Sequence, residues 1–205
     1  HGRYGLSRLW FGSVTDEVLH KADIPMFIVG PNVSWDPKMG TKLVREIVAL
    51  DGSAFAEKVL PLAVDVASAL GLKMALAKVT PGADLYYYQN GEGEGEEEDS
   101  FTESLDARAG KYLNEIRRRL GPNRVRLVES RVLHGPKVSE VLIEYADEAS
   151  GSLIALTTHA RTGLARGMLG SVVEELIHES PHPLLVLHVK GRGASPEKTE
   201  AAKSD

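Results

Sequence analysis

The chain carries one Gly-punctuated stretch twice, once at each end. Residues 1–25 begin HGRYGLSRLWFGSV, and residues 159–183 begin HARTGLARGMLGSV. The positions that carry the same residue in both copies are His1/His159, Arg3/Arg161, Gly5/Gly163, Leu6/Leu164, Arg8/Arg166, Gly12/Gly170, Ser13/Ser171, Val14/Val172, Glu17/Glu175, His20/His178 and Pro25/Pro183. Self-similarity that returns only after the length of a whole domain indicates a tandem duplication rather than a solenoid of short repeats.

Each copy ends in a short apolar run, IPMFIVG at 24–30 and HPLLVLHV at 182–189. Such runs are typical of buried strands in a parallel sheet, so each copy has the form of a domain's tail: a Gly-rich turn, a helix and a strand. Only the second copy has a domain body before it, and the first residue is His rather than Met. We therefore expect the front of the first domain to be missing from this chain.

The body between residues 42 and 190 alternates between strand and helix patterns. Strands are predicted over 43–50, 72–79, 124–133, 152–157 and 182–189, and helices over 55–71, 101–121 and 136–149, with one more helix after the second Gly-rich turn. Regular alternation implies right-handed crossovers and a parallel sheet with helices on both faces. The predicted fold class is therefore α/β, with a doubly wound sheet.

The composition limits which classes of partner the chain is expected to bind. The chain has no cysteine, which excludes disulfides and thiolate chemistry and fits a reducing compartment, so we expect a cytoplasmic protein. A net charge of -5 is not the electrostatic footprint of a nucleic-acid binder. No apolar run reaches the roughly eighteen residues of a membrane helix. We expect neither a nucleic-acid nor a membrane partner.

Much of the negative charge lies in residues 82–100. The acidic residues of this segment's run are Glu92, Glu94, Glu96, Glu97, Glu98 and Asp99. Such a run buries too little apolar surface to offset its ordering entropy, so it is predicted to be a mobile, solvated loop, with a cation-binding or partner-binding loop as the alternative. The tail at 191–205 is predicted to be disordered for the same reason.

Three blocks in this order carry a family resemblance: IVALDGSAFAEKVLPLAVDVASALG, VLHGPKVSEVLIEYADE and LIALTTHARTGLARGMLGSVVEELIHESPHPLLVL. In all three the chain resembles the universal stress protein family. The resemblance covers residues 42–190, which are expected to form a complete domain. Residues 1–31 resemble the C-terminal remnant of a preceding domain, and residues 32–41 are expected to be the linker.

The resemblance implies a five-stranded parallel sheet in the order 3-2-1-4-5, similar to the adenine nucleotide alpha hydrolases. A ligand is then expected where the strand order reverses, at the carboxyl ends of strands one and four. In the nucleotide-binding branch of the family, a turn with the pattern Gly-x-x-Gly, nine residues and Gly-Ser or Gly-Thr cradles the phosphates. The residues of this sequence on the implied nucleotide contacts are Asp51, Val79, Thr157, His159, Ala160, Gly170, Ser171 and Val172.

The chain departs from that pattern at two positions. Thr157 and Ala160 stand where the motif has glycine, and only Gly170 and Ser171 remain. Added side chains crowd the approach of backbone to phosphate, so ATP is predicted to bind weakly or not at all. We expect a stress-response module that acts through ligand binding and dimerisation. The alternatives are a slow ATP hydrolase and a structural dimerisation domain with no nucleotide.

Other candidate residues are assigned structural roles. Ser53 has no identifiable base and is expected to start the first helix. His178 and His182 lie among prolines that break helical spacing, so we predict no metal pair there. A small basic cluster suits a helix C-terminus, with an anion site as the alternative, and consists of Arg117, Arg118, Arg119, Arg124 and Arg126. His159 either contacts a phosphate or bonds the backbone, and the sequence leaves both readings open. We assign neither catalytic residues nor metal ligands.

The repeated stretch also predicts how two strands pair at the edge of the sheet. In this family the fifth strand lies at the sheet edge and pairs antiparallel with its counterpart, and an apolar edge strand needs a cover. We therefore predict that residues 25–30 run antiparallel to residues 183–189, with a helix at 13–22 lying over them. The result is an internal pseudo-dimer, or a homo-oligomer formed through the apolar surface left exposed.

Overall fold

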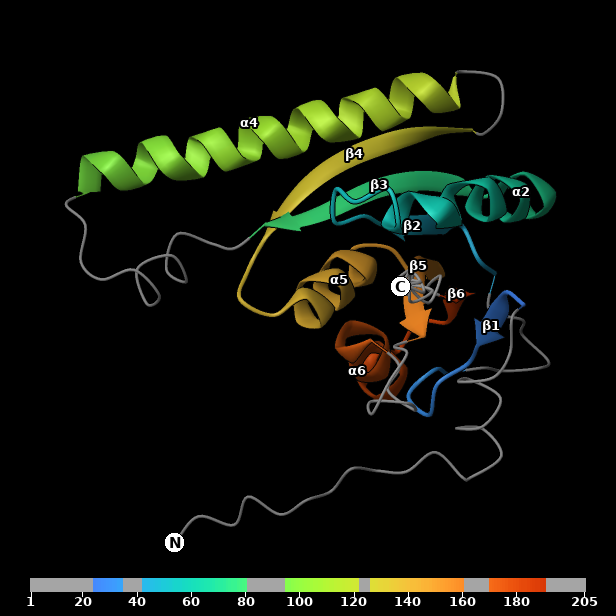
Figure 1. Cartoon of the computed structure of the whole chain (residues 1–205). Coiled ribbons are helices and arrows are strands. Elements are labelled where there is room, and N and C mark those ends of the chain that lie inside the picture. The colour runs from blue at the N-terminus through green and yellow to red at the C-terminus, as the bar shows by residue number, and fades with distance from the viewer. Residues whose placement is uncertain (1–23, 35–41, 81–94, 122–125, 161–169, 191–205) are drawn as a thin grey trace, which may run out of the picture.

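The computed structural model describes residues 24–34, 42–80, 95–121, 126–160 and 170–190. A six-stranded sheet forms the middle layer, and helices cover both of its faces (Figure 1). The strands are β1 (Met26–Ile28), β2 (Arg45–Ala49), β3 (Lys73–Thr80), β4 (Arg126–His134), β5 (Ser152–Ala160) and β6 (Leu184–Lys190). The helices are the 3-10 turn η1 (Ala56–Val59) and the α-helices α2 (Leu60–Leu70), α4 (Gly95–Leu120), α5 (Val138–Asp147) and α6 (Ser171–Glu179).

The strand order is β1-β6-β5-β2-β3-β4. Strands β2 to β6 pair in parallel, and β1 runs antiparallel to β6, with Met26 opposite Val186 and Ile28 opposite Leu184. The predicted order 3-2-1-4-5 and the predicted antiparallel pairing at the edge are both confirmed. The order reverses at β2, which lies between β3 and β5.

Two apolar cores hold the layers together. On one face η1, α2 and α4 cover the sheet, with Val48 and Leu113 in the core between them. On the other face α5 and α6 cover the sheet, with Ile47 of β2 and Leu176 of α6 in the core between them. Side chains that alternate along β2 enter opposite cores, which is why Ile47, Val48 and Ala49 are consecutive apolar residues in the sequence.

Strand β5 is longer than predicted. The sequence ended it at Thr157 and placed His159 and Ala160 on a Gly-rich turn, but β5 continues to Ala160. The reason is the ladder with β6, in which Thr157 pairs with Leu187 and Ala160 with Lys190. Backbone groups that find partners in a ladder favour the extended conformation. The prediction of a turn beginning at Thr157 is therefore wrong as far as Ala160, and the rest of the predicted turn (161–169) lies outside the described residues.

The prediction of a mobile loop is wrong for the second half of the acidic run. Helix α4 begins at Gly95, so the acidic residues 96–99 form its first turn. Negative charge stabilises a helix N-terminus, and Glu is a strong helix former. Figure 1 shows this end of α4 projecting past β3 and β4. The rest of the predicted loop (82–94), the helix at 13–22, most of the linker (35–41) and the tail (191–205) lie outside the described residues.

The segment 24–34 attaches to the domain at two places. Strand β1 pairs with β6, and beyond it Gly30 approaches α6 so closely that a Cβ there would overlap the carbonyl oxygen of Ile177. The side-chain amide of Asn32 donates to the carbonyl of His178 at 2.7 Å, at the last turn of α6. Three apolar side chains of the segment stay exposed, namely Ile24 (65%), Phe27 (48%) and Val29 (49%).

Candidate functional site

The sequence-predicted site residues gather at the carboxyl edge of the parallel strands. Asp51 follows β2, Val79 lies near the end of β3, and β5 ends at Ala160. Helix α6 begins at Ser171, directly after Gly170. This edge, at the reversal of strand order between β2 and β5, is where open α/β sheets bind ligands.

The turn after β2 is built on the side chain of Asp51. Its Oδ1 accepts a hydrogen bond from the Ser53 N–H at 2.7 Å, and the Ser53 Oγ accepts from the Ala56 N–H at 3.1 Å. Gly52 has φ +94°, a conformation that favours glycine. Ser53 therefore starts the helical segment, as predicted, and one carboxylate oxygen of Asp51 is already used by the turn.

The side chain of Thr157 connects β5 to η1. Its hydroxyl donates to the carbonyl oxygen of Ala56 at 3.1 Å. The side chain that replaces the first motif glycine is thus ordered across the place where a phosphate cradle is expected. This contact is the physical basis for the predicted weak binding of ATP.

Thr158 is a site residue that the sequence analysis missed. Its side chain is buried, and its Oγ1 accepts a hydrogen bond from the Gly170 N–H at 3.1 Å. Gly170 has φ -54°, so its backbone does not demand glycine, but a Cβ there would lie 3.4 Å from the Thr158 Oγ1. Thr158 thus fixes the start of α6 against β5. The sequence signal for this role was a second hydroxyl-bearing residue directly after Thr157.

The side chains of two further predicted residues, Val79 and Val172, pack against the core under α5 and α6. Ser171 is exposed at the first position of α6, whose N-terminus has no side-chain cap among the described residues. Uncapped N–H groups at a helix start favour an anion. The side chains of His159 and Ala160 lie outside the description.

Lys78 is a second residue that the sequence analysis missed. It is half-buried on β3, and its Nζ donates to the carbonyl oxygen of Asp51. A Cβ at Gly52 would lie 3.2 Å from this Nζ, so the ammonium rests against the turn that follows β2. A lysine near the end of an otherwise apolar strand was the signal in the sequence.

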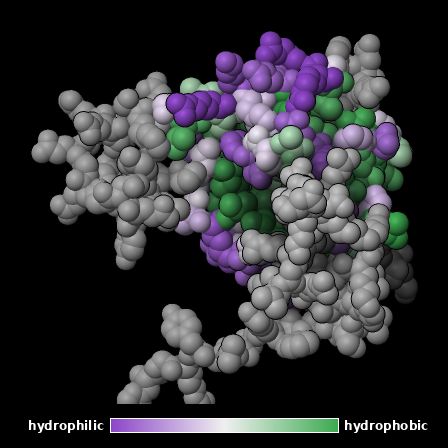
Figure 2. All heavy atoms as spheres, in the orientation of Figure 1, coloured by the Kyte–Doolittle hydropathy of each residue, from purple (hydrophilic) through white to green (hydrophobic). Residues whose placement is uncertain are grey.

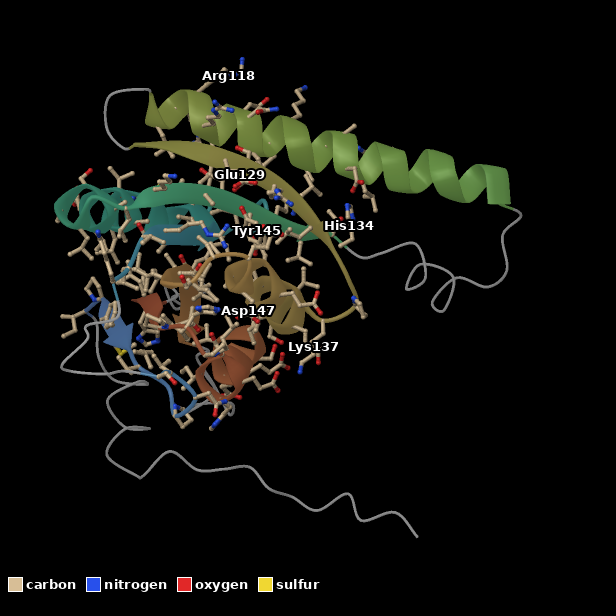
Figure 3. The ribbon with its side chains drawn as sticks, turned by 180° about the vertical axis from the view of Figure 1, so that it is seen from behind. Arg118, Glu129, His134, Lys137, Tyr145 and Asp147 are labelled. Carbon is tan, nitrogen blue, oxygen red and sulfur yellow. The ribbon has the colours of Figure 1, made fainter. Side chains whose placement is uncertain are left out.

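A cluster of three polar side chains joins α4 to the ends of β3 and β4. The buried Thr80 Oγ1 lies 3.0 Å from His134 Nδ1 and 3.3 Å from Asp106 Oδ1. The other nitrogen of His134, Nε2, lies 3.4 Å from Asp106 Oδ2. Figure 3 shows His134 at the end of β4, below α4. The cluster holds the middle of α4 over the carboxyl edge.

The outer face of α4 is strongly polar. Arg108, Lys111 and Arg118 are exposed along it, and the hydrophilic colour over this helix dominates the top of Figure 2. At its last turn Arg119 pairs with Glu57 of η1 at 2.6 Å. Burial, and then the nearby charge of Glu57, raise the pKa of Tyr112 on the inner face of α4.

Other candidate groups lie away from this edge. His182 Nε2 pairs with Asp147 Oδ1 at 2.7 Å, at the amino end of β6. Across the part of the chain that the structure describes, no three His, Asp or Glu side chains converge as a metal site. Within the same ranges, no helix has the length and apolar character needed to cross a bilayer.

Solved structures of the same fold are found by comparison. A universal stress protein from Archaeoglobus fulgidus superposes with a TM-score of 0.57 at 21% identity, covering 86% of this chain and 55% of that one. A universal stress protein solved in complex with cAMP superposes with a TM-score of 0.53 at 20% identity, covering 72% of this chain and 98% of that one. At this level of identity, both likenesses concern the fold.

Sequence comparison gives the family. A universal stress protein of Mycobacterium tuberculosis (strain H37Rv) is 26% identical over 195 residues, which cover 90% of this chain and 58% of that protein. This chain therefore spans little more than half the length of the curated relatives it matches. The model of the universal stress protein family matches residues 1–30 and 45–188, which is most of the chain. The chain belongs to the universal stress protein family.

Proposed function

We propose that the chain is a regulatory module that binds an adenine nucleotide weakly, at the carboxyl edge between β2 and β5. The observation that carries this proposal is the convergence of the Asp51 turn, the end of β3 and the uncapped start of α6 at the reversal of strand order. The relative solved with cAMP supports the ligand class, because it has the same fold.

The affinity should be low because the first motif glycine is replaced by an ordered side chain. The Thr157 hydroxyl is held by Ala56, and β5 continues as a strand to Ala160 instead of turning at Thr157. A phosphate that approaches this backbone must displace a side chain and break a hydrogen bond, which costs about 1 kcal/mol or more.

We propose that the module acts by binding and pairing rather than by turnover. The hydroxyl of Ser53 is occupied by the Ala56 N–H, and Asp51 supports its own turn. Residues 1–31 are proposed to end one domain, with 32–41 as linker, 42–190 as the second domain and 191–205 as a tail. The antiparallel pair of β1 and β6 supports an internal pseudo-dimer, because the two strands end the two repeated segments.

Calorimetric titration with ATP, AMP and cAMP tests the nucleotide proposal. We expect dissociation constants of roughly 0.1 mM or weaker, and a further loss of at least about fivefold in Asp51→Ala. Asp65→Ala is the matched control, since Asp65 is an exposed carboxylate on α2. Absence of binding to all three nucleotides at millimolar concentration would overturn the proposal. Phosphate release from ATP that depends on Asp51 would favour the hydrolase alternative.

A further inference from the structure

Lys78, a half-buried residue of β3, places a positive charge at the proposed nucleotide edge. An ammonium has three N–H donors, and one of them is accepted by the carbonyl oxygen of Asp51. Among the described residues Lys78 has no other hydrogen-bond partner and forms no ion pair with a carboxylate. Within the described residues its charge is therefore not paired with a carboxylate, and such a cation favours an anionic partner.

The position of this charge matches the reversal of strand order. The carbonyl oxygen of Asp51 lies just beyond β2, and β2 pairs directly with β5. The ammonium therefore lies at the carboxyl edge of the sheet, where β5 also ends. The uncapped start of α6, reached from β5, adds partial positive charge at the same edge. Both features attract one class of group, a phosphate.

We propose that Lys78 contacts the phosphate of the bound ligand and supplies the affinity that the replaced motif glycines do not. A lysine recognises phosphate as a point charge and does not need the close backbone approach that Thr157 and Ala160 prevent. The site then distinguishes a nucleoside phosphate from the free nucleoside. This inference rests on the proposed function, because it assigns the phosphate contact of the same site.

The test compares AMP with adenosine, which differ only in the phosphate. Calorimetry on the native chain should show AMP binding at least roughly tenfold tighter than adenosine, with the preference shrinking as salt rises. In Lys78→Gln that preference should fall to about twofold or less, with adenosine affinity nearly unchanged. Lys73→Gln is the matched control, because Lys73 is an exposed lysine at the opposite end of β3. Lys78→Arg should retain part of the preference.

Thermal unfolding of each variant keeps folding and binding apart, since Lys78 also supports the turn at Asp51. Equal preference for AMP in the native chain and in Lys78→Gln would overturn the assignment of Lys78 and leave the proposed function standing. Binding of adenosine and AMP with equal affinity to the native chain would do the same. Failure of both ligands to bind the native chain would overturn the proposed function, and the assignment of Lys78 with it.

Discussion

The hydroxyl of Thr157 donates a hydrogen bond to the carbonyl oxygen of Ala56, and this 3.1 Å contact joins β5 to the start of η1. The two residues lie near the edge at which the nucleotide is proposed to bind. A glycine at position 157 has no side chain and cannot make the bridge. Thr157 in place of the motif glycine therefore adds a side chain at the edge and links β5 to η1 by a hydrogen bond.

Restoring both glycines should open the site. In the double variant Thr157→Gly/Ala160→Gly, ATP should bind at least roughly tenfold tighter, because the backbone regains close approach and the Ala56 bridge is lost. The unfolding free energy should fall by about 1 to 2 kcal/mol, since glycine weakens a strand and the hydrogen bond disappears. Calorimetry and chemical denaturation measure the two effects.

Thr157→Ser is the matched control, because it keeps the hydroxyl that reaches Ala56. Its ATP affinity should stay close to the native value. Low-micromolar binding of ATP by the native chain would contradict the whole explanation of the replaced glycines.

The sheet was predictable from the sequence because its central strands are largely buried on both faces. Val48 and Ile47 enter opposite cores, and such strands appear as short apolar runs that alternate with helical patterns. The antiparallel pairing of β1 followed from the repeated stretch. The end of β5 was not predictable, because pairing of Ala160 with Lys190 is a tertiary effect that a local Gly-rich pattern hides.

Only part of the site was predictable. The family pattern predicted that Asp51 and Gly170 lie at the carboxyl edge of the sheet, where the structure has them, because the pattern describes backbone turns. Lys78 and Thr158 were missed because their roles depend on contacts across strands, with Asp51 and Gly170 respectively. Similarly, nothing in the local sequence joins His134 to Asp106, which approach one another only when α4 packs over β4.

Glu46 should make the stability of the fold fall as pH rises. The residue is fully buried, and its two carboxylate oxygens have no hydrogen-bond partner in the described structure. Burial raises the pKa of its carboxyl group from 4.5 to about 8. Between these values the unfolded chain loses the proton while the folded chain keeps it, so the unfolding free energy decreases through this window, by roughly 5 kcal/mol at most.

Glu46→Gln removes this titration and keeps the shape of the side chain. Denaturation midpoints of the variant should fall less between pH 4.5 and 8 than those of the native chain. Glu144→Gln, at an exposed position on α5, should leave the native pH dependence unchanged. Parallel pH profiles for the native chain and Glu46→Gln would show that Glu46 is solvated or paired in solution.

Two Gly→Ala substitutions should have opposite signs. In Gly30→Ala the new Cβ meets the backbone carbonyl of Ile177, so the segment 24–34 must shift from α6, at a cost of about 1 to 3 kcal/mol. In Gly110→Ala the Cβ meets nothing within 4 Å, and the helix should gain about 0.5 to 1 kcal/mol. Hydrogen exchange should show faster exchange in β1 only for Gly30→Ala. Unchanged exchange there would mean that Gly30 does not anchor the segment.

Replacing residues 89–99 with a Gly-Ser linker should shorten α4 without unfolding the domain. The described contacts of α4 with the strand ends are made by Asp106, well beyond the replaced residues. The unfolding midpoint should therefore change little, since loop length costs only logarithmically. The far-UV circular dichroism should lose about one turn of helix, because α4 begins at Gly95. A midpoint lower by many degrees would show that the acidic segment packs against the domain.

The exposed apolar side chains of β1 should drive self-association. Phe27 is 48% exposed on a strand that has β6 as its only partner among the described strands. An edge strand with an apolar surface pairs readily with a second copy, and a lysine there blocks such pairing. Phe27→Lys should therefore lower the dimer fraction measured by analytical ultracentrifugation over a concentration series. Leu70→Lys is the matched control, since Leu70 is 55% exposed at the end of α2, away from the edge. A native chain that stays monomeric over the whole concentration series would show that it has no association surface. An equal effect of both substitutions would show that the association surface lies elsewhere than on β1.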